Sequence, residues 1–146
     1  MKVYLDNCAL QRPLDDKSQM RIRLEAEAIL SILSLVRAGE IILISSEALT
    51  LEVRKNRLAT RRNYAASTLE LATFHVAVDD RVEHRAREFI RLGIQPLDAL
   101  HLALAEKADV DYFCTCDDRF LSKAKHVSDL GIAPVTPLEL IEELDL

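Results

Sequence analysis

Four acidic residues stand where the chain changes from one kind of local pattern to another. Asp6 and Asp117 each follow a short apolar run, whereas Glu52 and Asp98 lie in the first two turns of helical stretches. Clustered carboxylates raise one another's pKa unless a cation neutralises them, and hard oxygen ligands suit Mg²⁺ or Mn²⁺. A metal pair held by carboxylates can activate water and steady the leaving oxygen of a phosphodiester. If the fold brings the four acids together, they predict phosphodiester hydrolysis without a cysteine, serine or histidine nucleophile.

Each acid taken alone also has an ordinary structural explanation. These are an Asx turn for Asp6, the positive end of a helix dipole for Asp98, an N-cap for Asp117, and pairing with Lys55 or Asn56 for Glu52. Glu47 is a rival for Glu52, but its place at a helix start is explained by the helix dipole. The chemical hypothesis therefore depends on whether the fold makes the acids converge.

Short apolar runs alternate with longer helical patterns along the chain. Strands are predicted at 2–5, 41–44, 74–78, 112–115 and 133–135. Helices are predicted at 18–37, from Ser45 or Ser46 through Glu52 to about 71, and at 79–92, 97–108, 118–125 and 136–144. This alternation predicts a mostly parallel sheet of about five strands with helices on both faces. We expect a single α/β/α domain over residues 1–146, with the four acids at the carboxyl ends of its strands, where such sheets form their functional crevice.

The charge balance of the chain bears on whether it binds nucleic acid. The 146 residues carry 19 Lys and Arg against 24 Asp and Glu, a net charge of −5, which disfavours indiscriminate binding to nucleic acid. One basic segment follows Glu52 and comprises Arg54, Lys55, Arg57, Arg61 and Arg62. It is either a set of phosphate contacts for RNA or a solvated helix face.

No apolar run approaches the ~20 residues that span a bilayer, and the N-terminal residues lack a signal-peptide pattern. We therefore expect a cytoplasmic protein that does not enter a membrane. Three cysteines, at positions 8, 114 and 116, are expected to be buried thiols, because Cys-x-Cys alone is a weak zinc pattern. His101 shares a helix face with Asp98, and we interpret it as a packed histidine near the site rather than a metal ligand.

Several segments together resemble the PIN-domain nucleases, including the VapC-type toxins of bacterial toxin–antitoxin pairs. The segments are Val3-Tyr4-Leu5-Asp6-Asn7, Ser46 with Glu52, Asp98-Ala99-Leu100-His101-Leu102-Ala103, and Thr115-Cys116-Asp117. The resemblance covers residues 2 to about 137 and implies a Rossmann-like three-layer fold with metal-dependent RNA cleavage. It implies Asp6, Glu52, Asp98 and Asp117 as the catalytic, metal-binding acids.

The same resemblance implies supporting roles for Asn7, Thr115 and Asp118. Because Asp118 is an additional acid beside Asp117, the assignment of the metal-binding role between these two acids stays open. The resemblance also implies a small antitoxin protein as partner. The apolar circumference of the helix at 18–37 favours a homodimer. A domain of this fold that binds RNA or protein without turnover is the alternative function.

Two other classes fit less well. A receiver domain would place an acid pair after the first strand and a lysine after the fifth, where this chain has Thr136-Pro137. A haloacid-dehalogenase phosphatase needs Asp-x-Asp near the first strand, where this chain has Asp6-Asn7-Cys8.

Overall fold

The central feature of the structure, a computed structural model that describes residues 1–144, is one sheet with strand order β3-β2-β1-β4-β5. All four strand pairs are parallel. The strands are β1 (Lys2–Leu5), β2 (Ile42–Ser46), β3 (Phe74–Val76), β4 (Tyr112–Cys114) and β5 (Ala133–Val135). The mostly parallel sheet expected from the sequence is thus confirmed. The last two residues of the expected domain lie outside the described residues.

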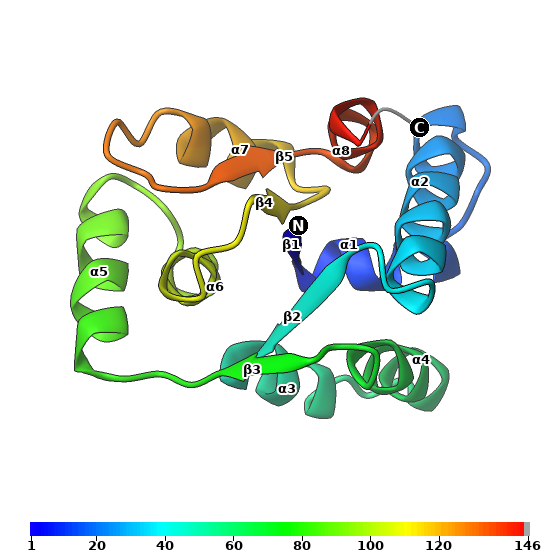
Figure 1. Ribbon diagram of the computed structural model, residues 1–146, viewed down its shortest axis with the longest axis horizontal. Helices are drawn as coiled ribbons and strands as arrows, with labels where there is room; N and C mark the ends of the chain where they lie inside the picture. The colour runs from blue at the N-terminus through cyan, green and yellow to red at the C-terminus, as the bar shows by residue number, and fades with distance from the viewer. Residues whose placement is uncertain (145–146) are drawn as a thin grey trace.

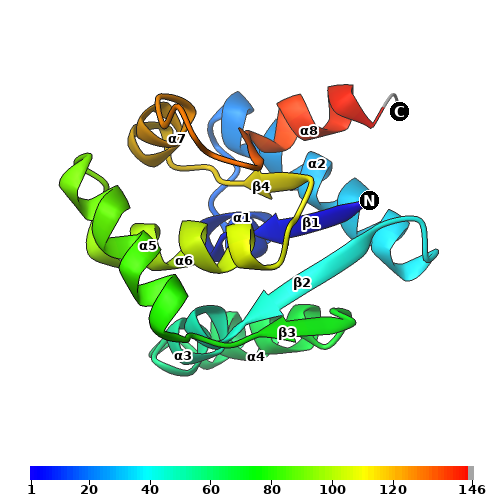
Figure 2. The same ribbon diagram turned by 60° about the vertical axis from the view of Figure 1, so that its left-hand side comes forward.

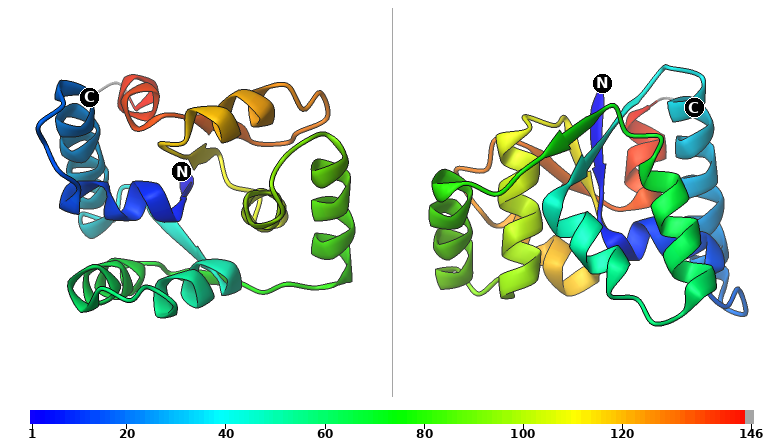
Figure 3. Two further views of the ribbon diagram at one scale, coloured as in Figure 1. Left: turned by 180° about the vertical axis from the view of Figure 1, so that it is seen from behind. Right: turned by 90° about the horizontal axis from the view of Figure 1, so that it is seen from below.

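Helices connect the strands and cover both faces of the sheet. They are α1 (Asn7–Gln11), the 3-10 turn η1 (Arg12–Leu14), α2 (Met20–Arg37), α3 (Glu47–Arg54), α4 (Ala59–Leu69), α5 (Asp80–Arg91), α6 (Pro96–Lys107), α7 (Asp118–Lys125) and α8 (Pro137–Glu143). In Figure 1, α1, α2 and α8 lie on one side of the sheet and α5 and α6 on the other. The views in Figure 2 and Figure 3 keep this separation, so the fold has three α/β/α layers.

The strand order fixes where the functional crevice must lie. From β1 the chain moves to β2 and β3 on one side, then crosses back to β4 and β5 on the other. This reversal places the topological switch point between β1 and β4, where parallel sheets bind their ligands at the carboxyl ends of the strands. Asp6 follows β1 at that point, and its backbone N–H donates to the Cys114 carbonyl at the end of β4 over 2.9 Å.

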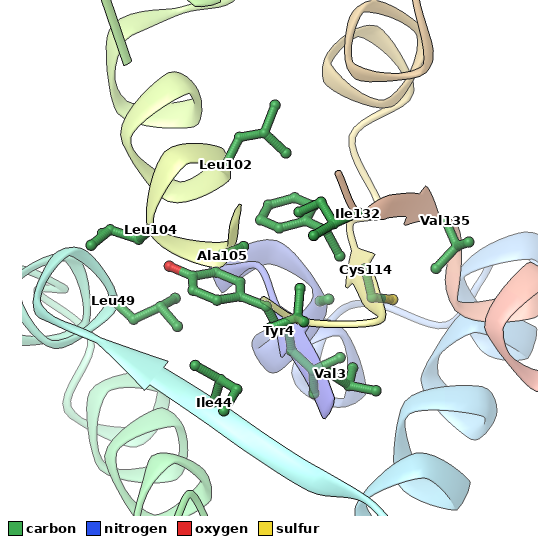
Figure 4. Close-up of a cluster of buried hydrophobic side chains, with 14 of the residues drawn as sticks. Val3, Tyr4, Ile44, Leu49, Leu102, Leu104, Ala105, Cys114, Ile132 and Val135 are labelled. Carbon is green, nitrogen blue, oxygen red and sulfur yellow. The ribbon is translucent and has the colours of Figure 1, made fainter. Parts of the chain in front are cut away.

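The central strand, β1, is buried on both faces of the sheet. Val3, Tyr4 and Leu5 have no exposed surface, and their neighbours come from β2 and β4. The ring of Tyr4 stacks on Phe113 with centroids 5.2 Å apart. Figure 4 shows Tyr4 within a cluster of buried hydrophobic side chains, to which it adds a polar hydroxyl group. A strand covered on both faces typically has a continuous apolar sequence, as Val3-Tyr4-Leu5 does.

One predicted helix is wrong. The stretch expected to run to about 71 breaks after Arg54, and a second helix starts at Ala59. The Asn56 side chain accepts a hydrogen bond from Leu58 N at 3.0 Å and donates one to Gln11 at 3.2 Å. Such side-chain bonds to nearby backbone compete with helical ones. The remaining predicted elements end within two residues of the observed ones, but the short α1 and η1 were not predicted.

No helix in the described part of the chain is long and apolar enough to cross a membrane. The three cysteines are free thiols, two of them buried and Cys8 partly so.

Candidate metal and active site

The four acids from the sequence line one cavity of about 360 Å³ at the carboxyl ends of the strands. They come from four separate segments, namely Asp6 after β1, Glu52 in α3, Asp98 in the first turn of α6 and Asp117 after β4. The other residues lining the cavity are Asn7, Cys8, Gln11, Asp15 and Arg61. Carboxylates thus outnumber cations in this cavity.

Asp6 is held by both of its carboxylate oxygens. Oδ1 accepts a hydrogen bond from Asn7 N at 2.7 Å, so that Asp6 caps α1, and Oδ2 accepts one from Thr115 Oγ1 at 2.9 Å. Thr115 Oγ1 in turn accepts from Asp117 N at 3.1 Å. Burial raises the pKa of Asp6, against the lowering influence of its hydrogen bond from Thr115. Thr115 therefore joins the two acids that flank the switch point.

The two neighbouring acids after β4 have different partners. Asp117 caps α7 by accepting from Phe120 N at 3.1 Å, and it lines the cavity. Asp118 is largely exposed and accepts two hydrogen bonds from Arg21, at 2.5 and 2.7 Å. This pairing lowers the pKa of Asp118. Asp118 is not among the cavity's lining residues, so the structure does not place it in a supporting role.

Asp98 shows the electrostatic strain of the cluster. Its pKa is raised from 3.8 to about 6, first by burial and then by the negative charges of Asp6 and Asp117. The position of Asp98 in the first turn of α6 would by itself favour the charged form. Burial and the neighbouring carboxylates outweigh that dipole, which is the behaviour expected of acids gathered without a counter-ion.

Glu52 pairs with His101 rather than with the neighbours suggested by the sequence. Its Oε1 lies 2.7 Å from His101 Nε2, so the alternative explanation of Glu52, a pairing with Lys55 or Asn56, is not the observed one. Burial would raise the pKa of Glu52, but its hydrogen bond with His101 outweighs burial and lowers it. The rival acid Glu47 instead accepts from the backbone N–H of Val78 at 2.9 Å, away from the cavity. His101 is buried, as interpreted from the sequence.

The donor set fits a hard divalent cation. Ligand atoms of Asp6, Glu52 and His101 lie within 4.8 Å of one another. His101 Nε2 is engaged with Glu52, which leaves carboxylate oxygens as the free ligands. Oxygen ligands suit Mg²⁺ or Mn²⁺, and a cation there would relieve the repulsion that raises the pKa of Asp98. The residues present are therefore suited to such an ion.

The break between α3 and α4 divides the predicted basic segment. Arg61 lines the cavity, where it donates to Asp15 at 2.7 Å and to Gln11 at 3.2 Å. Arg62 donates to the Asn56 carbonyl at 2.8 Å. The other three members are exposed on α3 or the turn, and Arg54 borders a separate hollow beside β3. The segment is therefore not one continuous basic face on the cavity.

Sequence reasoning missed Gln11 and Asp15 in the cavity wall, and it missed a buried contact of His101. Gln11 and Asp15 lie in the unpredicted segment after β1, where the spacing of Asn7 and Gln11 was the available signal, because Gln11 donates to Asn7 over one helical turn at 2.8 Å. The hydroxyl of Tyr4 lies behind the cavity, 2.6 Å from His101 Nδ1. No sequence pattern indicates that contact, since the two residues are 97 positions apart.

A larger hollow of about 610 Å³ borders α5 and α6, but its charges are balanced. Arg85 bonds Glu106 at 2.7 Å and Glu88 at 2.8 Å, and Lys107 pairs with Asp79 at 2.9 Å. The acidic cavity is thus the better candidate for ion-dependent chemistry.

Known proteins match this chain over most of its length. The family model described as PIN domain matches residues 3–126. Ribonuclease VapC46 of Mycobacterium tuberculosis is 30% identical over 142 residues, which is 92% of this chain and 97% of that protein. Two solved structures share the fold at low identity: VapBC2 from Rickettsia felis bound to a DNA fragment from their promoter, and PAE2754 from Pyrobaculum aerophilum.

The VapBC2 chain has a TM-score of 0.61 at 13% identity, with 93% of this chain and 98% of that chain covered. The PAE2754 chain has a TM-score of 0.54 at 18% identity, with 99% and 98% covered. These two structural likenesses support the fold. The family model and the sequence relative also support the family. The chain belongs to the PIN-domain family, as a VapC-type member.

Proposed function

We propose that this protein is a ribonuclease that hydrolyses RNA phosphodiester bonds with the help of Mg²⁺ or Mn²⁺. The observation that carries the proposal is the convergence of four carboxylates from four chain segments in one cavity. Asp6, Glu52, Asp98 and Asp117 are the proposed catalytic and metal-binding residues. The name of the relative VapC46, a ribonuclease, supports the same reaction.

The chain's own residues divide the work of such a site. A bound divalent ion would supply an activated water and stabilise the leaving oxygen. Asp6, Glu52, Asp98 and Asp117 would hold the ion. The hydrogen bonds from Thr115 to Asp6 and from Asp117 N to Thr115 keep two of these carboxylates in register. Asn7 also lines the cavity and bonds Gln11, which supports its proposed role in holding the wall.

Arg61 is the proposed first contact for an RNA phosphate. It lines the acidic cavity and is held by Asp15 and Gln11, so its guanidinium is already oriented. We propose that Arg54, Lys55, Arg57 and Arg62 add weaker, more distant contacts, because they lie outside the cavity lining. We propose that the protein acts on this RNA in the cytoplasm.

We further propose that a small antitoxin protein covers this site and that the chain forms a homodimer. The likeness to the VapBC2 structure from Rickettsia felis supports a partner protein for this type of fold. Leu24 and Leu30 on α2 are 42% and 46% exposed, which supports a contact between copies. Light scattering at micromolar concentration tests the dimer, and a monomer mass would contradict it.

Cleavage of a mixed single-stranded RNA pool tests the proposed reaction. We expect cutting with Mn²⁺ or Mg²⁺, no cutting with EDTA, and loss of cutting in Asp98→Asn. Asp118→Asn is the matched control, since this neighbouring acid pairs with Arg21 outside the cavity and should keep activity. Cutting that survives Asp98→Asn would contradict the site, and metal binding without any cutting would favour a binding module without turnover.

A further inference from the structure

A chain of hydrogen-bonded side chains runs from the sheet interior to the acidic cavity. Ser46 Oγ lies 2.7 Å from the Tyr4 hydroxyl, which lies 2.6 Å from His101 Nδ1. His101 Nε2 then lies 2.7 Å from Glu52 Oε1. Ser46, Tyr4 and His101 are at most 1% exposed, so Glu52 is the member that reaches the cavity. We name these four residues the buried relay.

The donors and acceptors along the buried relay can all be satisfied at once. An ionised Glu52 only accepts, so His101 Nε2 carries the hydrogen. A neutral imidazole then accepts at Nδ1 from the Tyr4 hydroxyl, and Tyr4 accepts from Ser46. Ser46 Oγ also accepts from Leu49 N at 3.1 Å, where it caps α3.

Packing prevents the imidazole from turning away from Glu52. The His101 ring meets the Tyr4 ring edge to face, with centroids 5.9 Å apart and planes at 68°. Tyr4 is itself stacked on Phe113 and lies within the apolar cluster of Figure 4. Rotation of His101 would take its two buried ring nitrogens away from these hydrogen-bond partners, which is costly in a low-dielectric interior.

We propose that His101 is a positioning residue that, anchored by the Tyr4 hydroxyl, fixes the Glu52 carboxylate at the angle at which it faces the ion site. The inference rests on the proposed function of the cavity. It differs from direct ligation, because His101 Nε2 is occupied by Glu52 rather than facing the cavity. Partners of this kind orient ligating carboxylates, and their loss lowers metal affinity or activity on the order of 10- to 100-fold.

Three variants test the relay against a purely structural role. Tyr4→Phe removes one hydroxyl and keeps the ring. His101→Leu removes both hydrogen bonds, whereas His101→Gln keeps an N–H donor toward Glu52. Tyr112→Phe is the matched control, because it removes a surface hydroxyl that bonds Glu143 at 3.3 Å, far from the cavity. Far-UV circular dichroism and thermal unfolding verify that every variant is folded at the assay temperature.

Four readouts are taken on the folded proteins. Calorimetric titration of metal-free protein with Mn²⁺ gives the affinity, RNA cleavage gives kcat and KM, and ¹⁵N NMR of the imidazoles gives the tautomer of His101. Pulsed electron paramagnetic resonance of the Mn²⁺-loaded protein detects any directly bound nitrogen. We expect His101 to hold its hydrogen on Nε2, with that preference weakened in Tyr4→Phe, and no bound nitrogen.

We expect Tyr4→Phe and His101→Leu to lower Mn²⁺ affinity and kcat about 10-fold or more with KM unchanged, and His101→Gln to recover part of the loss. Wild-type Mn²⁺ affinity and kcat in folded Tyr4→Phe and His101→Leu would overturn the inference, as would a nitrogen bound to Mn²⁺. If wild type binds Mn²⁺ but cuts no RNA, the proposed ribonuclease fails while the titration and the NMR still decide the relay. If wild type binds no Mn²⁺, both proposals fail.

Discussion

Replacing Asp98 by Asn should make the metal-free protein more stable at neutral pH while destroying its proposed activity. Asn keeps the shape of the side chain and removes a charge that burial disfavours and that Asp6 and Asp117 repel. The pKa of Asp98, raised from 3.8 to about 6, corresponds to about 3 kcal/mol of unfavourable free energy in the charged form. Solvent screening at this partly exposed carboxyl reduces the expected gain to about 1–2 kcal/mol.

The sign of the pH dependence follows from the direction of the pKa shift. At pH 4 and below, Asp98 is protonated in the folded protein and only partly ionised in the unfolded chain, so wild type and Asp98→Asn should differ little. As pH rises from about 4 through 6, the unfolded chain releases this proton more readily than the folded protein does, and wild type loses stability. The advantage of Asp98→Asn should therefore grow across this window and stay constant above about pH 7.

Urea unfolding followed by far-UV circular dichroism, in EDTA at pH 4 and pH 8, measures the effect. The gain at pH 8 should also raise the melting temperature by about 2–4 °C per kcal/mol. Mn²⁺ should reverse the order of stability, because binding stabilises wild type more than the variant. Asp118→Asn, which removes an exposed acid paired with Arg21, should give no gain at either pH. A variant no more stable than wild type at pH 8 in EDTA would refute the repulsion argument.

Three further changes test other parts of the structure. Arg61→Ala should weaken RNA binding and flatten its salt dependence, whereas Arg54→Ala, outside the cavity, should have a smaller effect in the same filter-binding titration. Glu25→Ala should lower the free energy of unfolding by about 3 kcal/mol, because buried Glu25 lies 3.2 Å from the Arg12 guanidinium, and urea midpoints measure this. Thr115→Val should lower RNA cleavage with little change in fold, since Thr115 donates to Asp6 from a buried position, and single-turnover rates at fixed Mn²⁺ measure it.

The strands were predictable because each leaves a local mark on the sequence. β1 and β2 are buried on both faces, and continuous apolar runs carry that information within four or five residues. The break between α3 and α4 was not predictable in the same way. It depends on Asn56 meeting Gln11, a residue 45 positions earlier, and local helix signals continue across it.

The candidate site also has features that local sequence patterns predict and features that depend on distant residues. That the carboxylates would meet at one sheet edge followed from the strand–helix alternation alone, since parallel strands end on the same side. Which carboxylate points into the cavity depended on distant partners. Asp118 accepts a hydrogen bond from Arg21, which is 97 positions away in the sequence. Glu52 is hydrogen-bonded to His101, which is 49 positions away. The roles of these acids as metal ligands stay a prediction.

The ordinary and the chemical explanations of the acids turn out to be compatible. Asp117 uses Oδ1 to cap α7, which fixes the side chain through a bond to Phe120 N and leaves Oδ2 for the cavity. Asp6 likewise caps α1 through Oδ1, while Thr115 holds Oδ2. A carboxylate already held by its own helix loses less side-chain entropy when an ion binds. Helix capping here supplies the preorganisation that a metal site requires, so a capping role counts in favour of a ligand role at these two positions.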